Sequence, residues 1–189
     1  MIGRELRGKG LVLVGYRGTG KSTVGRILAA RLGRSFVDAD LALESQVGVP
    51  VRAIFEEHGE DYFRDLEERV LLDLTALPDH VIATGGGAIL RESNREVLRD
   101  YGLVVWLTAT PEELGSRLAA NRRQVLGRPA LTTLGTLDEI ATVLQARLPF
   151  YKEASDMEVS TEGRSASDVA QAIISRLTGT MLDPQGALT

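Results

Sequence analysis

The stretch Gly15-Tyr16-Arg17-Gly18-Thr19-Gly20-Lys21-Ser22 matches the Walker A pattern at every position that the pattern constrains. Its glycines let successive backbone N–H groups turn inward and approach phosphate oxygens closely. Lys21 supplies a point charge for the β- and γ-phosphates of a nucleotide, and Ser22 offers a hydroxyl to Mg²⁺. The stretch therefore predicts a P-loop that binds a nucleoside triphosphate.

The flanking sequence supplies the strand and the helix that a P-loop requires. Leu11–Val14 is a short apolar run typical of a buried strand, and a helical pattern begins near Lys21 and ends around Leu32 and Gly33. The positive end of that helix would point at the bound phosphates. A glycine-rich turn that matched by accident would have no reason to lie between such elements, so the context favours a true nucleotide site.

Strands and helices continue to alternate along the chain. Four more strands are expected at Ser35–Val37, Val81–Ala83, Leu103–Leu107 and Asp156–Ser160. Helices are expected at Val51–His58, at Asp61–Leu77, from Pro111 onward and at Ala166–Leu177. This alternation predicts an α/β fold of three layers, in which helices cover both faces of a five-stranded parallel sheet. Ligands of such sheets bind beyond the carboxyl ends of the strands.

The composition limits the classes of partner. The chain has 189 residues, of which 43% are hydrophobic and 25% charged, as expected for one domain with a sizeable core. Its net charge of −4 disfavours nucleic acid as a partner. The absence of cysteine excludes disulfides, thiolate metal sites and cysteine nucleophiles. The sequence has neither a long apolar run nor a signal-peptide pattern. We therefore expect a monomeric cytoplasmic protein with no membrane partner.

Two further groups of residues follow predicted strands. Asp38 and Asp40 come at the end of the second strand, where alternate residues face one side, so both carboxylates are expected in one crevice. One could hold a Mg²⁺-bound water and the other could deprotonate a substrate hydroxyl, although an isolated Asp-x-Asp would be a solvated turn. Gly85, Gly86 and Gly87 end the third strand and leave room for a ligand beside the backbone.

A P-loop alone does not distinguish a phosphotransferase from a nucleotide-binding switch that acts through partner proteins. A GTPase-type switch requires an Asn-Lys-x-Asp motif that reads the base and an Asp-x-x-Gly motif directly after the third strand. The chain has no Asn-Lys-x-Asp, and no Asp-x-x-Gly stands directly after its predicted third strand. The motifs therefore favour a phosphotransferase.

From about Leu11 to Leu177 the chain resembles the shikimate kinase family. The resemblance rests on the order and rough spacing of six blocks, which are the Walker A loop, Phe36-Val37-Asp38-Ala39-Asp40, Phe63-Arg64-Asp65-Leu66-Glu67, Gly85-Gly86-Gly87, Gly127-Arg128-Pro129 and Arg147-Leu148-Pro149-Phe150-Tyr151. It implies a fold similar to that of nucleoside-monophosphate kinases, with a helical substrate-binding region at about 40–77 and a lid at about 121–137. Residues 1–178 would form this single kinase domain, and 179–189 a disordered tail.

The resemblance implies that the protein phosphorylates the 3-hydroxyl of shikimate with ATP and Mg²⁺, a step of aromatic amino-acid biosynthesis. The ATP phosphates would lie against Gly18, Thr19, Gly20, Lys21, Ser22 and Thr23. Arg117 and Arg164 would lie against the adenine. Ser22 would bind Mg²⁺ directly and Asp38 through water. Arg128, on the lid, would reach the transferring phosphoryl group and act in catalysis with Lys21 and Asp40.

The same resemblance assigns a substrate site. Asp40 would hold a ring hydroxyl and act as the base, and Arg64 and Arg147 would grip the carboxylate, for which the planar fork of arginine is suited. The remaining contacts would come from Gly85, Gly86, Gly87, Phe55 and Phe63. Without the resemblance, both arginines would be interpreted as surface residues. Another sugar-acid kinase, such as a gluconate kinase, is the alternative enzyme, against which the glycines and Phe63-Arg64 argue.

Overall fold

The computed structural model describes residues 10–124 and 137–179. Its strands are β1 (Gly10–Val14), β2 (Ser35–Asp38), β3 (His80–Ala83), β4 (Gly102–Thr108) and β5 (Met157–Ser160). They form one sheet in the order β2-β3-β1-β4-β5, and every neighbouring pair is parallel. The predicted α/β fold with a five-stranded parallel sheet is therefore confirmed. The strand that leads into the P-loop, β1, lies at the centre of this sheet.

The helices lie between successive strands, except for the last one, which follows β5. They are α1 (Lys21–Leu32), α2 (Ala39–Val47), α3 (Val51–Thr75), the short 3₁₀ turn η2 (Ala88–Leu90), α4 (Glu92–Tyr101), α5 (Pro111–Gln124), α6 (Leu137–Ala154) and α7 (Ala166–Leu177). The two helices expected at Val51–His58 and Asp61–Leu77 form one element, α3, which breaks at Gly59 with φ 80° and ψ −178°. Only glycine adopts this conformation without steric cost.

The sequence patterns above do not predict α2 or α4. In α4, the buried face includes two polar side chains, Asn94 and Arg95, so it lacks the apolar spacing that identifies a helix. Asn94 donates a 2.9 Å hydrogen bond to the Ala88 carbonyl oxygen, and Arg95 donates one of the same length to that of Ile89. Buried polar side chains thus hold α4 against the turn that follows β3.

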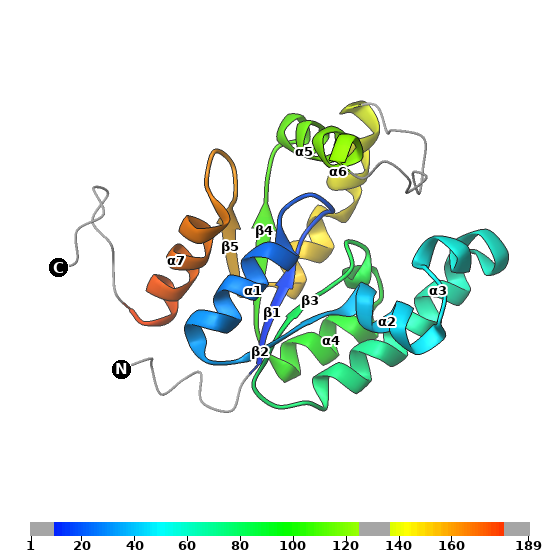
Figure 1. Ribbon diagram of the computed structural model, residues 1–189, viewed down its shortest axis with the longest axis horizontal. Coiled ribbons are helices and arrows are strands. Elements are labelled where there is room, and N and C mark those ends of the chain that lie inside the picture. The colour runs from blue at the N-terminus through cyan, green and yellow to red at the C-terminus, as the bar shows by residue number, and fades with distance from the viewer. Residues whose placement is uncertain (1–9, 125–136, 180–189) are drawn as a thin grey trace.

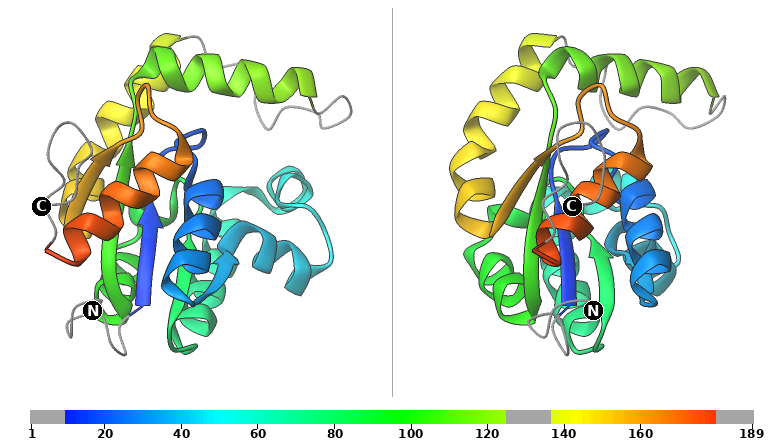
Figure 2. Two further views of the ribbon diagram at one scale, coloured as in Figure 1. Left: turned by 60° about the vertical axis from the view of Figure 1, so that its left-hand side comes forward. Right: turned by 90° about the vertical axis from the view of Figure 1, so that its left-hand side faces the viewer.

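Alternate residues of β1 divide the core into two layers. Leu11 and Leu13 pack against α1 and α7 on one face of the sheet, whereas Val12 and Val14 pack against α2, α3, α4 and α6 on the other. Figure 1 shows the sheet between these helices, and the right-hand view of Figure 2 shows it nearly edge-on. Burial on both faces explains why the strand is a continuous apolar run rather than an alternating one.

The carboxyl ends of the strands meet at one edge of the sheet, because all five strands are parallel. The P-loop lies at this edge, with α5 standing above it (Figures 1 and 2). Of the predicted lid at 121–137, residues 121–124 continue α5 and Leu137 begins α6. The other lid residues and residues 180–189 of the predicted tail lie outside the described residues. None of the helices described has the length and apolar character needed to cross a bilayer.

Candidate active site

The P-loop follows β1 and leads into α1, as its sequence predicts. Gly20 caps the amino end of α1 in the left-handed conformation, with φ 88°. Gly15 has φ 144°, and a Cβ atom there would lie 2.5 Å from the Leu107 carbonyl oxygen. Thr19 closes the turn by donating a 2.8 Å side-chain hydrogen bond to the Tyr16 carbonyl oxygen. These contacts present the amino end of α1 at the mouth of the loop, where an anion is favoured.

Lys21 is buried within the loop. Its Nζ donates hydrogen bonds of 2.7 Å to the Gly15 carbonyl oxygen and 3.0 Å to that of Tyr16. Burial lowers the pKa of Lys21 to about 8, although the nearby carboxylates of Asp40 and Asp38 act in the opposite direction. A buried ammonium gains stability from additional negative charge, which the phosphates of a nucleotide would supply.

Asp38 and Asp40 meet beside Lys21, but not in the way that strand alternation predicted. Asp38 ends β2 and caps α2, where its Oδ1 accepts hydrogen bonds from the backbone N–H groups of Asp40 and Leu41 at 3.2 and 3.4 Å. Asp40 lies in the first turn of α2, so the prediction that both residues occupy a strand is wrong. A helix cap, rather than the pleat of a strand, turns both carboxylates toward the P-loop.

The environment of Asp40 disfavours its charge. Burial raises the pKa of the Asp40 carboxyl, the neighbouring Asp38 raises it further, and Lys21 opposes both. A raised pKa brings a carboxylate closer to the range that suits a general base at neutral pH. Asp40 therefore combines the position and the basicity expected of a group that takes a proton.

Ser22 and Asp38 supply oxygen atoms next to the phosphate site. The Ser22 hydroxyl donates a 2.5 Å hydrogen bond to Asp38 Oδ2. Among the described residues, no three His, Cys, Asp or Glu side chains are grouped so that they could hold a metal ion. Mg²⁺ in nucleotide sites takes only one or two protein oxygens and completes its shell with phosphates and water. The pair therefore fits a Mg²⁺ ion that arrives with a nucleotide.

Each of the three glycines after β3 faces a different part of the site. A Cβ atom on Gly85 would lie 2.7 Å from Asp40 Oδ1 and 2.8 Å from Glu67 Oε1. One on Gly86 would lie 3.3 Å from the backbone nitrogen of Arg17, and one on Gly87 would overlap the Arg64 guanidinium. The glycines are required because protein groups already pack against them. The expectation of room for a ligand at the bare backbone stays a prediction.

Arg64, on α3, is held by two glutamates of the same helix. Its Nη1 donates a 2.7 Å hydrogen bond to Glu67 Oε2, while its Nε and Nη2 donate to Glu60 Oε1 at 3.2 and 2.9 Å. Glu67 is almost fully buried, and burial raises its pKa although Arg64 opposes the shift. The guanidinium also lies over the ring of Phe63, whose centroid is 4.5 Å from that of Phe55.

Two side chains of α6 converge on the carbonyl oxygen of Gly86. Arg147 Nη1 donates a hydrogen bond of 3.0 Å and the Tyr151 hydroxyl one of 2.7 Å. Tyr151 is buried, and its ring stacks on Trp106 of β4 with centroids 5.4 Å apart. Burial raises the pKa of Tyr151 to about 12, so the hydroxyl keeps its proton and remains a donor. Arg64 of α3 and Arg147 of α6 thus approach the same glycine turn.

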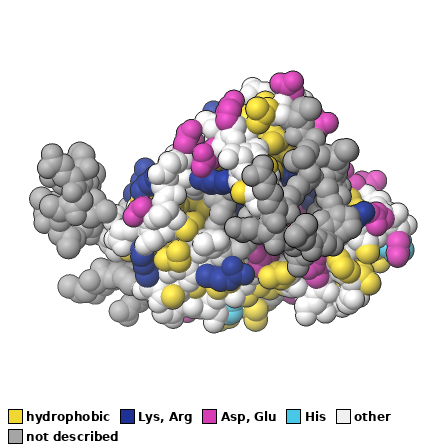
Figure 3. Space-filling view, turned by 45° about the horizontal axis from the view of Figure 1, so that its top comes forward, with side chains coloured by type: hydrophobic (Ala, Val, Ile, Leu, Met, Phe, Trp, Pro, Cys, Tyr) yellow, Lys and Arg dark blue, Asp and Glu magenta, His cyan; other side chains and the backbone are white. Residues whose placement is uncertain are grey.

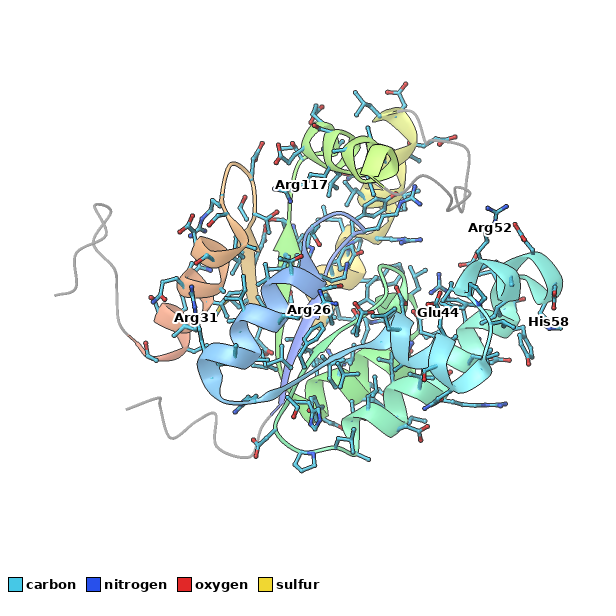
Figure 4. The ribbon with its side chains drawn as sticks, in the orientation of Figure 1. Arg26, Arg31, Glu44, Arg52, His58 and Arg117 are labelled. Carbon is cyan, nitrogen blue, oxygen red and sulfur yellow. The ribbon has the colours of Figure 1, made fainter. Side chains whose placement is uncertain are left out.

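The nucleotide side of the site is a cavity of about 680 Å³. It is lined by the predicted ATP residues that the structure describes, which are Gly18, Thr19, Gly20, Lys21, Ser22, Thr23, Arg117 and Arg164. Arg117 reaches from α5 toward the P-loop (Figure 4) and donates hydrogen bonds to the carbonyl oxygens of Gly18 and Thr161 at 3.3 and 2.8 Å. Asp40 and Gly86 also line this cavity, and the Gly86 carbonyl oxygen accepts the hydrogen bond from Arg147. Arg128 lies outside the described residues.

The structure adds residues that the sequence patterns did not assign to the site. Glu67 contacts Arg64, Tyr151 contacts Gly86, and Thr161 contacts Arg117. The spacing of Arg64 and Glu67 on the helix expected at Asp61–Leu77 was the available signal, since residues three apart are neighbours on a helix. Tyr151 and Thr161 carry no comparable local signal, because their partners are 65 and 44 residues away.

Positive and negative side chains are mixed on the surface beside the site. Figure 3 shows Lys and Arg side chains lying among Asp and Glu on the face that includes the carboxyl end of the sheet. Within the part of the chain that the structure describes, this face carries no broad basic surface. Arg64, Arg117 and Arg147 instead donate hydrogen bonds to specific carboxylate and carbonyl oxygens.

Comparisons with known proteins agree with this geometry. The model of the shikimate kinase family matches residues 17–178. A shikimate kinase from Symbiobacterium thermophilum is 44% identical over 167 residues, which cover 88% of this chain and 95% of that protein. The chain is also similar to the structure of a shikimate kinase from Acinetobacter baumannii in complex with shikimate, with 37% sequence identity and a TM-score of 0.83. This match covers 90% of this chain and 93% of that chain. The structure of a gluconokinase from Sinorhizobium meliloti has 18% sequence identity to this chain and a TM-score of 0.55. The match covers 90% of this chain and 94% of that chain, and it shows a shared fold alone.

Proposed function

The chain belongs to the shikimate kinase family, and we propose that it transfers the γ-phosphoryl group of ATP to the 3-hydroxyl of shikimate. The observation that carries the proposal is the arrangement around Gly86. This residue lines the P-loop cavity together with Lys21 and Asp40, and its carbonyl oxygen accepts a hydrogen bond from Arg147. Groups suited to binding phosphate, accepting a proton and binding a carboxylate would therefore lie together around this residue.

The P-loop would bind and orient the triphosphate. Gly18 to Thr23 line the cavity together with Arg117 and Arg164. Lys21 would exchange its hydrogen bonds with the loop carbonyls for phosphate oxygens and neutralise charge during transfer. Arg128, assigned from the family resemblance, would contribute a second positive charge to the transferring group.

Asp40 would act on the accepting hydroxyl. Its carboxylate would take the proton as the hydroxyl oxygen forms a bond to the γ-phosphorus, while the bond from that phosphorus to ADP breaks. Its raised pKa suits a group that accepts a proton at neutral pH. Arg64 and Arg147 would bind the substrate carboxylate, and the three glycines and Phe55 and Phe63 would lie against the ring. Phosphoryl transfer depends mostly on such positioning and on neutralising charge.

A Mg²⁺ ion bound with the nucleotide would be held by Ser22 directly and by Asp38 through water. It would neutralise charge on the β- and γ-phosphate oxygens. The 2.5 Å hydrogen bond between the two side chains supports this assignment, because it places the Asp38 carboxylate next to the Ser22 hydroxyl at the amino end of α1. The monomeric state, the cytoplasmic location and the lack of nucleic-acid or membrane partners stay predictions from composition.

Steady-state assays with ATP and Mg²⁺ test the proposal. The acceptors are shikimate, quinate, gluconate and a nucleoside monophosphate, and formation of ADP is measured. We expect phosphorylation of shikimate with a kcat/KM at least 10²-fold above that of every other acceptor, because a site built for a specific hydroxyl pattern rejects analogues strongly. Faster phosphorylation of gluconate would instead support the sugar-acid kinase alternative.

A further inference from the structure

Each nitrogen of the Arg64 guanidinium donates a hydrogen bond to a glutamate of α3 in the free protein. Glu67 takes Nη1, and the single oxygen Oε1 of Glu60 takes Nε and Nη2 together. On its remaining side the guanidinium packs against the backbone of Gly87. The edge formed by Nε and Nη2 is therefore occupied by Glu60. A substrate carboxylate can bind this edge with two parallel hydrogen bonds only by replacing Glu60.

The two glutamates differ in how easily they can be replaced. The Glu67 side chain is 3% exposed, and the Glu60 side chain is 58% exposed. Removing Glu67 from Arg64 would leave an unpaired charge in the interior, which is strongly unfavourable. Glu60 can turn into water, and it stays near the start of the second half of α3, after the break at Gly59. Negative charge is favoured at that end of a helix.

The edge that Glu60 occupies is also the edge that suits a ligand. Arginine binds carboxylates best through two parallel N–H groups, and Nε and Nη2 form such a pair. We propose that Glu60 is an internal competitor for the substrate carboxylate at Arg64, and that substrate binding displaces it. This inference rests on the proposed role of Arg64 in shikimate binding. Glu60 would thereby raise the dissociation constant of the acid substrate.

The size of the effect follows from the strength of the displaced ion pair. A partly exposed pair at i and i+4 is weak, and the apparent dissociation constant rises as the fraction of Arg64 that is free of Glu60 falls. Removing the Glu60 carboxylate should therefore lower the dissociation constant of shikimate by about two- to fivefold. Affinity for ATP should not change, because Glu60 is not among the residues that line the nucleotide cavity.

The test is titration calorimetry of shikimate and of ATP with wild type, Glu60→Gln and Glu60→Ala. A matched control is Glu56→Gln, because Glu56 forms an i, i+4 ion pair with Arg52 on the same helix and is 59% exposed. Figure 4 shows Arg52 at the outer part of α3. Asp61→Asn is a second control, which removes a charge next to Glu60 that is outside the ion pairs of Arg64. Both controls should leave shikimate affinity unchanged.

The methyl ester of shikimate separates direct competition from other effects. Because the ester has no carboxylate, Glu60→Gln should tighten shikimate binding and leave ester binding unchanged. Equal or weaker shikimate binding in both Glu60 variants would overturn the inference, and so would equal tightening in Asp61→Asn. These outcomes are distinct from failure of the proposed function, in which the wild-type protein would neither bind nor phosphorylate shikimate.

Discussion

The Tyr151 hydroxyl donates a 2.7 Å hydrogen bond to the Gly86 carbonyl oxygen, which also accepts a hydrogen bond from Arg147. One carbonyl group thus links α6 to the glycine turn through two donors. If Arg147 turns to bind a substrate carboxylate, Tyr151 alone keeps this oxygen paired. The stacking of Tyr151 on Trp106 and its burial hold the hydroxyl in place for this purpose.

Tyr151→Phe should lower the free energy of unfolding by about 1 kcal/mol, the usual contribution of one hydrogen bond. It should also raise the KM for shikimate about fivefold, because binding of Arg147 to the substrate would then leave the Gly86 oxygen unpaired. The KM for ATP should stay the same. Urea denaturation followed by the fluorescence of Trp106, the only tryptophan, measures the first effect. A change in the KM for ATP alone would contradict this account.

Lys21→Met should lower kcat by about 10²-fold or more, because it removes a charge that stabilises the transferring phosphoryl group. Methionine keeps most of the volume of the side chain, so the fold should persist. The assay is single-turnover transfer at saturating ATP, with circular dichroism as the control for folding. A folded variant with near-normal turnover would contradict the assignment of Lys21.

The same variant makes the pH dependence of stability testable. Lys21 has a pKa of about 8 in the folded protein and 10.5 as a free side chain, so between these values the unfolded chain binds more protons. The stability of the wild type relative to Lys21→Met should therefore rise between pH 8 and 10, by roughly 1–3 kcal/mol. Below pH 8 the difference should be constant. Denaturation curves of both proteins across this range provide the measurement. A difference in unfolding free energy that does not change with pH would exclude the lowered pKa of Lys21.

Asp40→Asn should lower kcat by about 10²-fold or more, as expected when a general base is removed. It should nevertheless make the free protein more stable at pH 7, because burial and Asp38 raise the pKa of Asp40 and disfavour its charged form. The folded state holds this proton more tightly, so the advantage of the variant should vanish as the pH falls toward 4. Thermal unfolding of both proteins at pH 5 and 7 tests whether the variant is the more stable protein and whether its advantage is smaller at pH 5.

Gly85→Ala should weaken shikimate binding and destabilise the protein by about 1–3 kcal/mol, because the new methyl group would press on Asp40 and Glu67. ATP binding should remain, since Gly85 does not line the nucleotide cavity. Gly115→Ala is a matched control, because its methyl group would meet mainly the flexible end of Leu137. Titration calorimetry with shikimate and with ATP distinguishes the two effects. A loss of ATP binding equal to the loss of shikimate binding would show a general defect of the fold.

The sequence by itself determined the parts of this protein whose physics is local. The apolar run of β1, the glycines of the P-loop and the start of α1 at Lys21 are consecutive, so one stretch of chain specifies a phosphate site. The alternation of strands and helices predicted the parallel sheet for the same reason, since each element is identified by its own pattern.

Only the tertiary structure decided how charged groups meet. Asp40 entered the site from a helix that the sequence patterns missed, and α4 was missed because Asn94 and Arg95 form part of its buried face. The hydrogen bond from the Tyr151 hydroxyl to the Gly86 carbonyl oxygen spans 65 residues. Burial sets the pKa values of Lys21 and Asp40. These properties arise from distances between segments far apart in the chain, which no local pattern encodes.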